Sequence, residues 1–168
     1  MTRHVIREAD IDWERAPSGR HPFNPASEMR MVRLGDMSGL KRLGVNLVRI
    51  PPGKESFIPH AHLVEEEIAF VIQGAGEVVL DGVHHPIGPG DYVGFPTDGV
   101  VHSIVNTGDV DLVYLTVGER ARVEVATMPT IGKTIVFHDN RMTRLDHAGR
   151  DELTAEEWVT KMQLPPTG

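Results

Sequence analysis

The sequence predicts an all-β fold, a small single-domain barrel built from short strands. Turn-forming residues divide the chain, with 12 Pro and 17 Gly among its 168 residues, and turns this frequent favour strands over helices. Between the turns, segments such as residues 43–50 alternate with the period of two that is typical of a strand. Apolar residues make up 40% of the chain, so a chain of this length can form one hydrophobic core.

Before the barrel, residues 1–35 are expected to form an arm that packs on it. Three prolines between positions 17 and 25 prevent long helices in this region. Ile11 and Trp13 could dock on the barrel or on a partner subunit, and a locally packed flap is the simpler interpretation. The arm shows no helix-turn-helix pattern, which argues against a transcription factor.

The first barrel strand, residues 43–50, leaves the role of Arg49 open. Val45, Leu47 and Arg49 share one face, because alternate side chains of a strand point to the same side. If that face is the barrel interior, Arg49 is a candidate clamp for an anionic substrate. If the face lies at the rim, the guanidinium extends into water.

The strand predicted at residues 67–72 is apolar on both faces. Ile68, Phe70 and Ile72 lie on one side, and shorter apolar residues lie on the other. A strand buried on both sides needs cover from outside its own sheet, which either a second sheet or another subunit supplies. Together with the N-terminal arm, this pattern predicts a homodimer.

The dipeptide Asp81-Gly82 predicts a tight two-residue hairpin turn between two short strands. His84 and His85 follow the turn and are adjacent, so they face opposite sides of their strand and cannot both point inward. We expect both at the surface.

A histidine pair is the first indication of chemistry. In an extended strand His60 and His62 project from the same face and can reach one metal ion together. Glu67 has the wrong parity on a straight strand, but a short turn through residues 63–66 would aim its carboxylate back at the two imidazoles. By itself, a His-x-His pair is more often a solvated strand face than a metal site.

His102 adds a fourth group from another short apolar strand. Three imidazoles and one carboxylate form a set of nitrogen and oxygen ligands that suits one divalent transition metal ion, namely iron, manganese, nickel, cobalt or zinc. Asn106 has the same parity as His102, so it could face the site or serve a turn.

These two stretches resemble the paired motifs of the cupin superfamily. The first motif is matched, in order, by Gly53, His60, His62, Glu67 and Gly74. The second motif is matched by Gly90, Pro96, Gly99, His102 and Asn106. The spacers before His60 and after Pro96 are one residue longer than the usual pattern, and both fall in turns. The resemblance covers residues 40–118.

The resemblance implies the cupin double-stranded β-helix, a jelly-roll barrel, with a metal ion bound by His60, His62, Glu67 and His102. It indicates far less about the reaction, because cupins include dioxygenases, isomerases, epimerases, lyases, decarboxylases and non-catalytic binding proteins. We expect three regions: an arm at 1–35, a cupin core at 36–118 and a C-terminal extension at 119–168.

In the C-terminal extension, residues 123–125 and 134–137 are predicted to be edge strands that pack outside the barrel. The segment from Thr154 to Glu157 has the form of a capping box, which predicts a short helix that ends before Pro165. Four histidines lack ligand spacing and are expected to be bystanders: His4, His21, His138 and His147.

The composition argues against several classes of partner and location. The formal net charge of −7 disfavours a nucleic-acid partner, and the absence of cysteine excludes disulfide and thiol chemistry. The N-terminus carries charges where a signal peptide needs an apolar core, and no apolar run is long enough to span a bilayer. We therefore expect a cytoplasmic protein without a membrane partner.

Two functional hypotheses follow. The first is a metalloenzyme, of the dioxygenase, isomerase or lyase type, that acts on a small oxygen-rich metabolite at open positions of the metal ion. The second is a small-molecule binding or sensing protein whose metal ion holds a ligand without turning it over. A general acid or base beside the ligands would favour the enzyme, and Tyr92 and Tyr114 are candidates by residue type.

Overall fold

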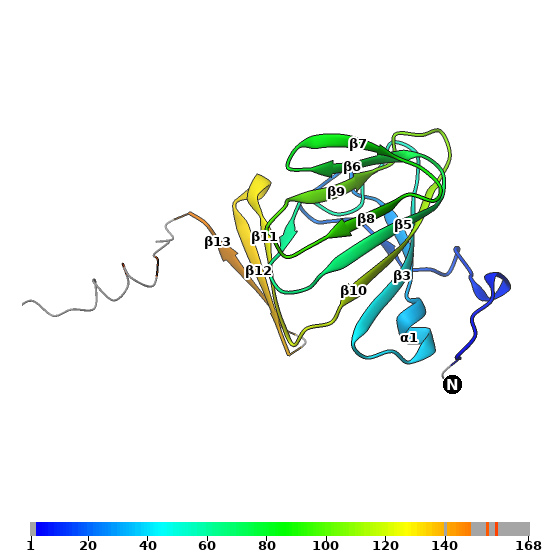
Figure 1. Cartoon of the computed structure of the whole chain (residues 1–168), viewed down its shortest axis with the longest axis horizontal. Coiled ribbons are helices and arrows are strands. Elements are labelled where there is room, and N and C mark those ends of the chain that lie inside the picture. Colours follow the sequence, from blue (N-terminus) through cyan, green and yellow to red (C-terminus); the bar gives the residue numbers. More distant parts are fainter. Residues whose placement is uncertain (1–2, 140, 149–153, 155–156, 158–168) are drawn as a thin grey trace, which may run out of the picture.

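Two antiparallel sheets face each other and enclose the main hydrophobic core (Figure 1). The structure, a computed structural model, describes residues 3–139, 141–148, 154 and 157. Within these residues the larger sheet has, in order, β1 (Ser18–Gly19), β2 (Met29–Val32), β3 (Leu43–Ile50), β10 (Leu112–Glu119), β5 (Glu67–Gln73) and β8 (Tyr92–Phe95). The smaller sheet has β7 (Val83–Ile87), β6 (Gly76–Leu80) and β9 (His102–Val105). This architecture confirms the predicted all-β barrel.

The core lies between the sheets because the inward side chains of both are apolar. Val48 and Ile50 of β3 pair with Tyr114 and Leu112 of β10, and all four residues are at most 5% exposed. Ile104 of β9 packs against them from the smaller sheet. The even-numbered residues of β3 therefore face the interior, and the odd-numbered ones face outward.

Part of the N-terminal arm packs on the outer face of the larger sheet, whereas β1 and β2 extend the sheet itself. Ile11 and Trp13 join an apolar cluster with Leu47 of β3. On the same face, the Arg49 guanidinium lies 5.5 Å from the centre of the Trp13 ring and forms an ion pair with Asp111 at 2.5 Å. Arg49 points away from the barrel interior, so the hypothesis that it clamps a substrate is wrong. The helical segments here are η1 (Glu8–Asp10) and α1 (Leu34–Ser38).

The outer face of β5 is only partly covered within the part of the chain that the structure describes. Phe70 and Ile72 are 41% and 49% exposed, whereas Ala69 and Val71 on the inner face are at most 1% exposed. The smaller sheet covers the inner face and cannot reach the outer one. A partner subunit remains the candidate cover, and the homodimer stays a prediction.

The hairpin between β6 and β7 has the predicted turn. Asp81 and Gly82 both adopt positive φ, at 48° and 81°, which is the conformation of a type I′ turn and the reason for the Asp-Gly sequence. His84 and His85 are both exposed on β7, as expected, and His84 lies 2.7 Å from the Glu77 carboxylate.

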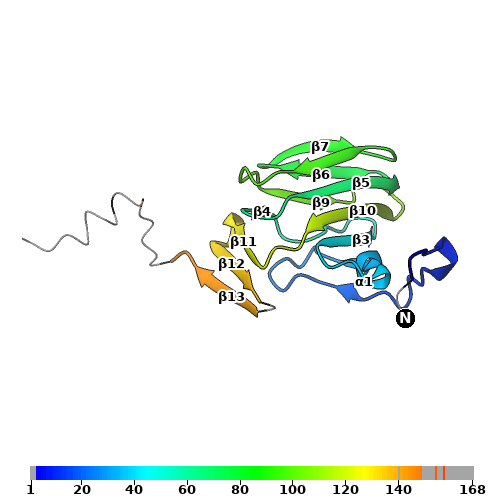
Figure 2. The same cartoon turned by 60° about the horizontal axis from the view of Figure 1, so that its bottom comes forward.

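The C-terminal extension forms a third sheet, and this sheet includes part of the first histidine motif. Its order is β13 (Arg141–Asp146), β12 (Lys133–His138), β11 (Val123–Met128) and β4 (Ala61–His62), with the turn η2 (Pro129–Ile131) between β11 and β12. Figures 1 and 2 show β11 to β13 at one end of the barrel, with β4 beside β11 in Figure 2. The predicted strands are present, but the first of them, β11, pairs with the strand that carries His62.

Near the C-terminus, the predicted capping box has both of its hydrogen bonds. The Thr154 amide donates to the Glu157 carboxylate, and the Glu157 amide donates to the Thr154 hydroxyl, at 2.8 and 3.1 Å. The rest of the predicted helix lies outside the described residues. Among the residues that are described, no helix is long and apolar enough to cross a membrane.

Candidate metal centre

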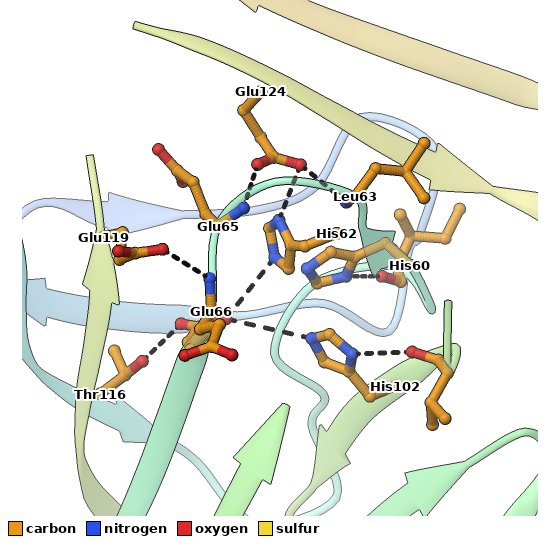
Figure 3. A network of polar contacts seen from close by, with 12 residues as sticks. His60, His62, Leu63, Glu65, Glu66, His102, Thr116, Glu119 and Glu124 are labelled. Atoms are coloured by element: carbon orange, nitrogen blue, oxygen red, sulfur yellow. Dashed lines mark hydrogen bonds and ion pairs between the residues drawn. The ribbon is translucent and has the colours of Figure 1, made fainter. Parts of the chain in front are cut away.

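Four side chains converge at the end of the barrel where the third sheet begins. His60, His62, Glu67 and His102 each offer one ligand atom, and these atoms lie within 4.8 Å of one another. One oxygen of Glu67, Oε2, lies 3.6 Å from Nε2 of His62 and 3.9 Å from Nε2 of His102. Figure 3 shows the three imidazoles turned toward a common centre. The structure thus brings together the four residues that the motifs single out.

Hydrogen bonds between backbone segments hold the three histidines in position. His60 and His102 form an isolated antiparallel bridge, in which each backbone amide donates to the other residue's carbonyl at 3.1 and 2.8 Å. His62 is held in β4 by pairing with Ala126 of β11. After His62 the chain bends, and β5 begins at Glu67, so the carboxylate returns to the side of the imidazoles as the parity argument required.

Hydrogen bonds select the tautomers of two histidines. Nδ1 of His60 lies 2.8 Å from the Ile58 carbonyl, and Nδ1 of His102 lies 3.2 Å from the Val100 carbonyl. Because a carbonyl only accepts, each Nδ1 carries the proton and each Nε2 keeps its lone pair. Nε2 of His102 is buried and has no hydrogen-bond partner among the described residues. An unpartnered buried lone pair that faces a carboxylate and two further imidazoles fits a metal ligand.

The third histidine, His62, lies next to the Glu124 carboxylate of β11. Glu124 is 3% exposed, and its Oε1 lies 3.5 Å from Nδ1 of His62 (Figure 3). The carboxylate also accepts hydrogen bonds from the backbone amides of Leu63 and Glu65, at 3.1 and 2.6 Å. Nδ1 of His62 makes no hydrogen bond among the described residues, but the charge of Glu124 beside it favours the tautomer of His62 that carries the proton on Nδ1, which leaves Nε2 free for a metal ion.

Sequence reasoning missed Glu124, although a signal was available. Along 123–128 the residues alternate, and Glu124 shares its parity with Ala126 and Met128. A charged residue on the apolar, buried side of a strand requires a partner. That partner could have been sought among the histidines of the first motif.

Burial and neighbouring charges shift the pKa values of the cluster in different directions. Burial, reinforced by His102 and His62, lowers the pKa of His60 to about 4. Burial also lowers the pKa of His102. Burial alone would lower the pKa of His62 as well, but the carboxylates of Glu67 and Glu124 outweigh it and raise that pKa. Among the three histidines, His62 is therefore the one whose pKa lies above its ordinary value.

The shared carboxylate is kept ionised. Burial alone would raise the pKa of Glu67, but the hydrogen bonds from His62 and from the Thr116 hydroxyl outweigh it, so that pKa is lowered. Thr116 donates to Oε1, which leaves Oε2 directed at the imidazoles. A carboxylate of this kind supplies the negative charge that a divalent cation requires.

A cavity of about 170 Å³ opens inward from the four residues. Of the two tyrosines considered as a general acid or base, Tyr114 lines this cavity, whereas Tyr92 is 65% exposed on the outside of β8. Burial and the nearby Glu67 carboxylate raise the pKa of Tyr114 far above its usual range. Asn106 does not face the cavity, since its amide donates to the carbonyls of Ile50 and Val110 and holds a turn.

Comparisons with known proteins place the chain in a family. A cupin domain model matches residues 46–118. A sugar phosphate isomerase of the cupin superfamily from Silicibacter pomeroyi is 31% identical, with a TM-score of 0.74, and the match covers 88% of this chain and 98% of that one. The chain belongs to the cupin superfamily.

Two other proteins are also similar to this chain. A structure of a proposed sugar phosphate isomerase from Acidithiobacillus ferrooxidans is 33% identical, with a TM-score of 0.84, and the match covers 89% of this chain and 96% of that one. The oxalate-binding protein of Thermotoga maritima is 33% identical over 116 residues, which are 69% of this chain and 93% of the relative.

Proposed function

We propose that this cupin is a metalloenzyme that binds one divalent ion through His60, His62, Glu67 and His102 and isomerises a small carbonyl compound. The observation that carries the proposal is the convergence of three imidazoles and an ionised carboxylate at a cavity. A divalent ion there would polarise a carbonyl or carboxylate oxygen of the substrate as a Lewis acid. The three neutral imidazoles and single carboxylate would leave up to two octahedral positions for substrate oxygens.

Tyr114 is the residue of the cavity suited to a proton-donating role. Because its pKa is raised, the phenol stays neutral and can donate a hydrogen bond to a developing oxyanion. Thr116 and Glu67 lie on the same wall, where their hydrogen bond orients the carboxylate. Two similar proteins that match nearly nine tenths of the chain are described as sugar phosphate isomerases, one of them as a proposed one, which supports an isomerase-type reaction.

One observation favours a second candidate, a binding protein that does not turn its ligand over. Among the described residues that line the cavity, the titratable groups besides the four proposed ligands reduce to Tyr114, and a neutral phenol cannot take a proton from a substrate. A similar protein is described as oxalate-binding. The two candidates differ in whether protons are exchanged at bound substrate.

The first test is the metal content. Protein purified without chelator or a nickel column should carry close to one transition metal ion per chain by elemental analysis, and His102→Ala should lose it. Full occupancy in the His102→Ala protein would contradict the four-ligand centre.

The second test separates the two candidates. Metal-loaded protein is incubated with α-hydroxy carbonyl compounds, including fructose 6-phosphate, in D₂O, and exchange beside the carbonyl is followed by NMR. The enzyme predicts exchange that falls roughly 100-fold in Tyr114→Phe at unchanged metal content. Calorimetric binding of oxalate without exchange of any of these compounds would favour the binding protein.

A further inference from the structure

A second hollow, much larger than the inner cavity, opens beside the metal centre. It has a volume of about 570 Å³, and we call it the apolar groove. Its apolar walls are formed mainly by large side chains: Phe23, Phe57, Met128, Ile135, Phe137 and Met142. Four of these side chains are partly exposed although they are large and apolar: Phe23, Phe57, Phe137 and Met142.

One wall of the groove is a single face of the third sheet. Phe137 of β12 pairs with Glu124 of β11 and with Met142 of β13, and Ile135 pairs with Ala126. Directly paired residues point to the same side of a sheet. The apolar side chains therefore share the face on which Glu124 reaches His62.

The groove is continuous with the metal centre. His60 and His62 line both the groove and the inner cavity, and so does Phe57. The Phe57 ring packs edge-on against the His60 imidazole, with centroids 6.3 Å apart at 88°. A ligand whose oxygens occupy the open side of the metal centre would extend the rest of its body into the groove.

The groove offers little to a strongly charged ligand. Its lining has one guanidinium, Arg144, which lies 5.7 Å from the centre of the Phe23 ring. The nearby ammonium of Lys133 is already paired with Asp146. A bound phosphate is usually held by several converging donors, whereas walls of Phe and Met favour a flat apolar body. His21 also lines the groove, at a distance from the group of proposed metal ligands.

From these observations we infer that the ligand is an aromatic or similarly flat apolar molecule that carries adjacent oxygen donors at one end. Its oxygens face the metal centre, its rings lie between the third sheet and the loop that bears Phe23, and Arg144 accommodates a further polar or anionic substituent. This inference rests on the proposed function, because it takes the metal ion as the anchor for the oxygens.

The test compares two probes with the same chelating oxygens and different ring area. Salicylate has one ring, and 3-hydroxy-2-naphthoate has two. Binding of each to cobalt-loaded protein is measured by calorimetry, and the cobalt absorption spectrum reports contact with the oxygens. The second ring should strengthen binding roughly tenfold if it lies against apolar walls. Elemental analysis after the titration checks that the probe has not removed the metal.

A matched pair of variants assigns the gain to the groove. Phe137→Ala removes a groove wall, and Phe70→Ala makes the same change on the outer face of β5; the two side chains are 43% and 41% exposed. The advantage of the naphthoate should disappear in Phe137→Ala and persist in Phe70→Ala, with circular dichroism showing that both variants fold.

Three outcomes would overturn the inference, and they can be told apart. Equal affinity for the two probes, or an advantage that survives Phe137→Ala, refutes the groove site while the metal centre stands. Equal naphthoate binding by chelator-treated protein refutes the metal anchor of the inferred ligand, whereas the proposed function falls only if the metal content and the exchange in D₂O fail. Dissociation of a dimer by Phe137→Ala, with no naphthoate binding by the wild type, assigns the groove to a second copy of this chain.

Discussion

Replacement of Glu124 by Gln tests whether a residue outside both cupin motifs controls the metal centre. The change keeps the size of the side chain and removes its charge. Glu124 lies 3.5 Å from Nδ1 of His62 and is 3% exposed, so solvent does not compensate for the lost charge. The proton on Nδ1 would lose a carboxylate partner, and the imidazole would become a weaker and less well oriented ligand.

The expected magnitude follows from the contacts of this carboxylate. Loss of an outer partner of a metal-binding histidine lowers metal affinity roughly 10- to 100-fold, which corresponds to about 1.4–2.7 kcal/mol. Gln has one carbonyl oxygen where Glu124 has two acceptors, and these serve the amides of Leu63 and Glu65. The Leu63 amide also donates to the Val125 carbonyl at 3.1 Å, so only the Glu65 amide depends on this carboxylate. The free energy of unfolding should therefore fall by about 1 kcal/mol at most.

The assay is a competition of zinc between the protein and a chelator of known affinity at neutral pH. Glu119→Gln is the control, because Glu119 is an exposed carboxylate that accepts from the Glu66 amide at 3.2 Å in the same loop (Figure 3). It removes the same charge without facing a proposed ligand. Circular dichroism of the metal-free variants shows whether each one folds.

A Glu124→Gln affinity within twofold of the wild type would refute the reasoning. A loss equal to that of Glu119→Gln would also refute it, because the effect would then reflect only the net charge of the loop. The expected result is a much larger loss in Glu124→Gln alone.

Three further predictions concern protons, folding and assembly. Because the pKa of His62 is raised while those of His60 and His102 are lowered, acidification should first set one proton, at His62, against the metal ion. Metal affinity should then fall about tenfold per pH unit, and more steeply near pH 4, where His60 also takes a proton. A potentiometric slope of three protons per ion at pH 6 would contradict this. A core of this size does not need the metal to fold, so chelator-treated protein should keep a cooperative thermal transition in circular dichroism, with a melting temperature lower by about 5–10 °C. The Glu67→Gln protein should show the same behaviour. If the metal-free protein had no cooperative transition, the ion would be required for folding. We propose that the protein forms a homodimer through the outer face of β5. The wild type should then sediment as a dimer at micromolar concentration, and the Ile72→Lys variant as a monomer. A monomeric wild type would exclude the proposed dimer.

Local sequence patterns were sufficient for the barrel strands and for each of the two motifs, and the resemblance to cupins joined His102 to the other three side chains. The His60-x-His62 spacing specifies two imidazoles on one face, because the side chains of a strand alternate. The turn after His62 follows from the apolar alternation that restarts at Glu67. The Asp81-Gly82 turn is equally local, since the two residues adopt the positive φ values that the hairpin needs. Each of these inferences uses residues only a few positions apart.

Which face of a strand is the interior depends on pairing, and so the sequence left Arg49 open. Its parity with Val45 and Leu47 was correct, but the opposite set, with Val48 and Ile50, faces the core. Both sets are largely apolar because the N-terminal arm covers the outer face with Trp13. The same limit applied to Tyr92 and Tyr114, which the structure places on opposite sides of the larger sheet.

The sequence by itself indicated the family, the strands and the residues that can hold a metal ion. Each motif is written in spacings of two to ten residues, and the resemblance to the paired cupin motifs joins His102 to the other three. Only the tertiary structure decided that β11 pairs with β4, that Glu124 stands behind His62, and that the C-terminal strands form the apolar groove. The first two of these contacts join residues about 60 positions apart. Their register is selected by the packing of whole sheets, and no local period encodes it.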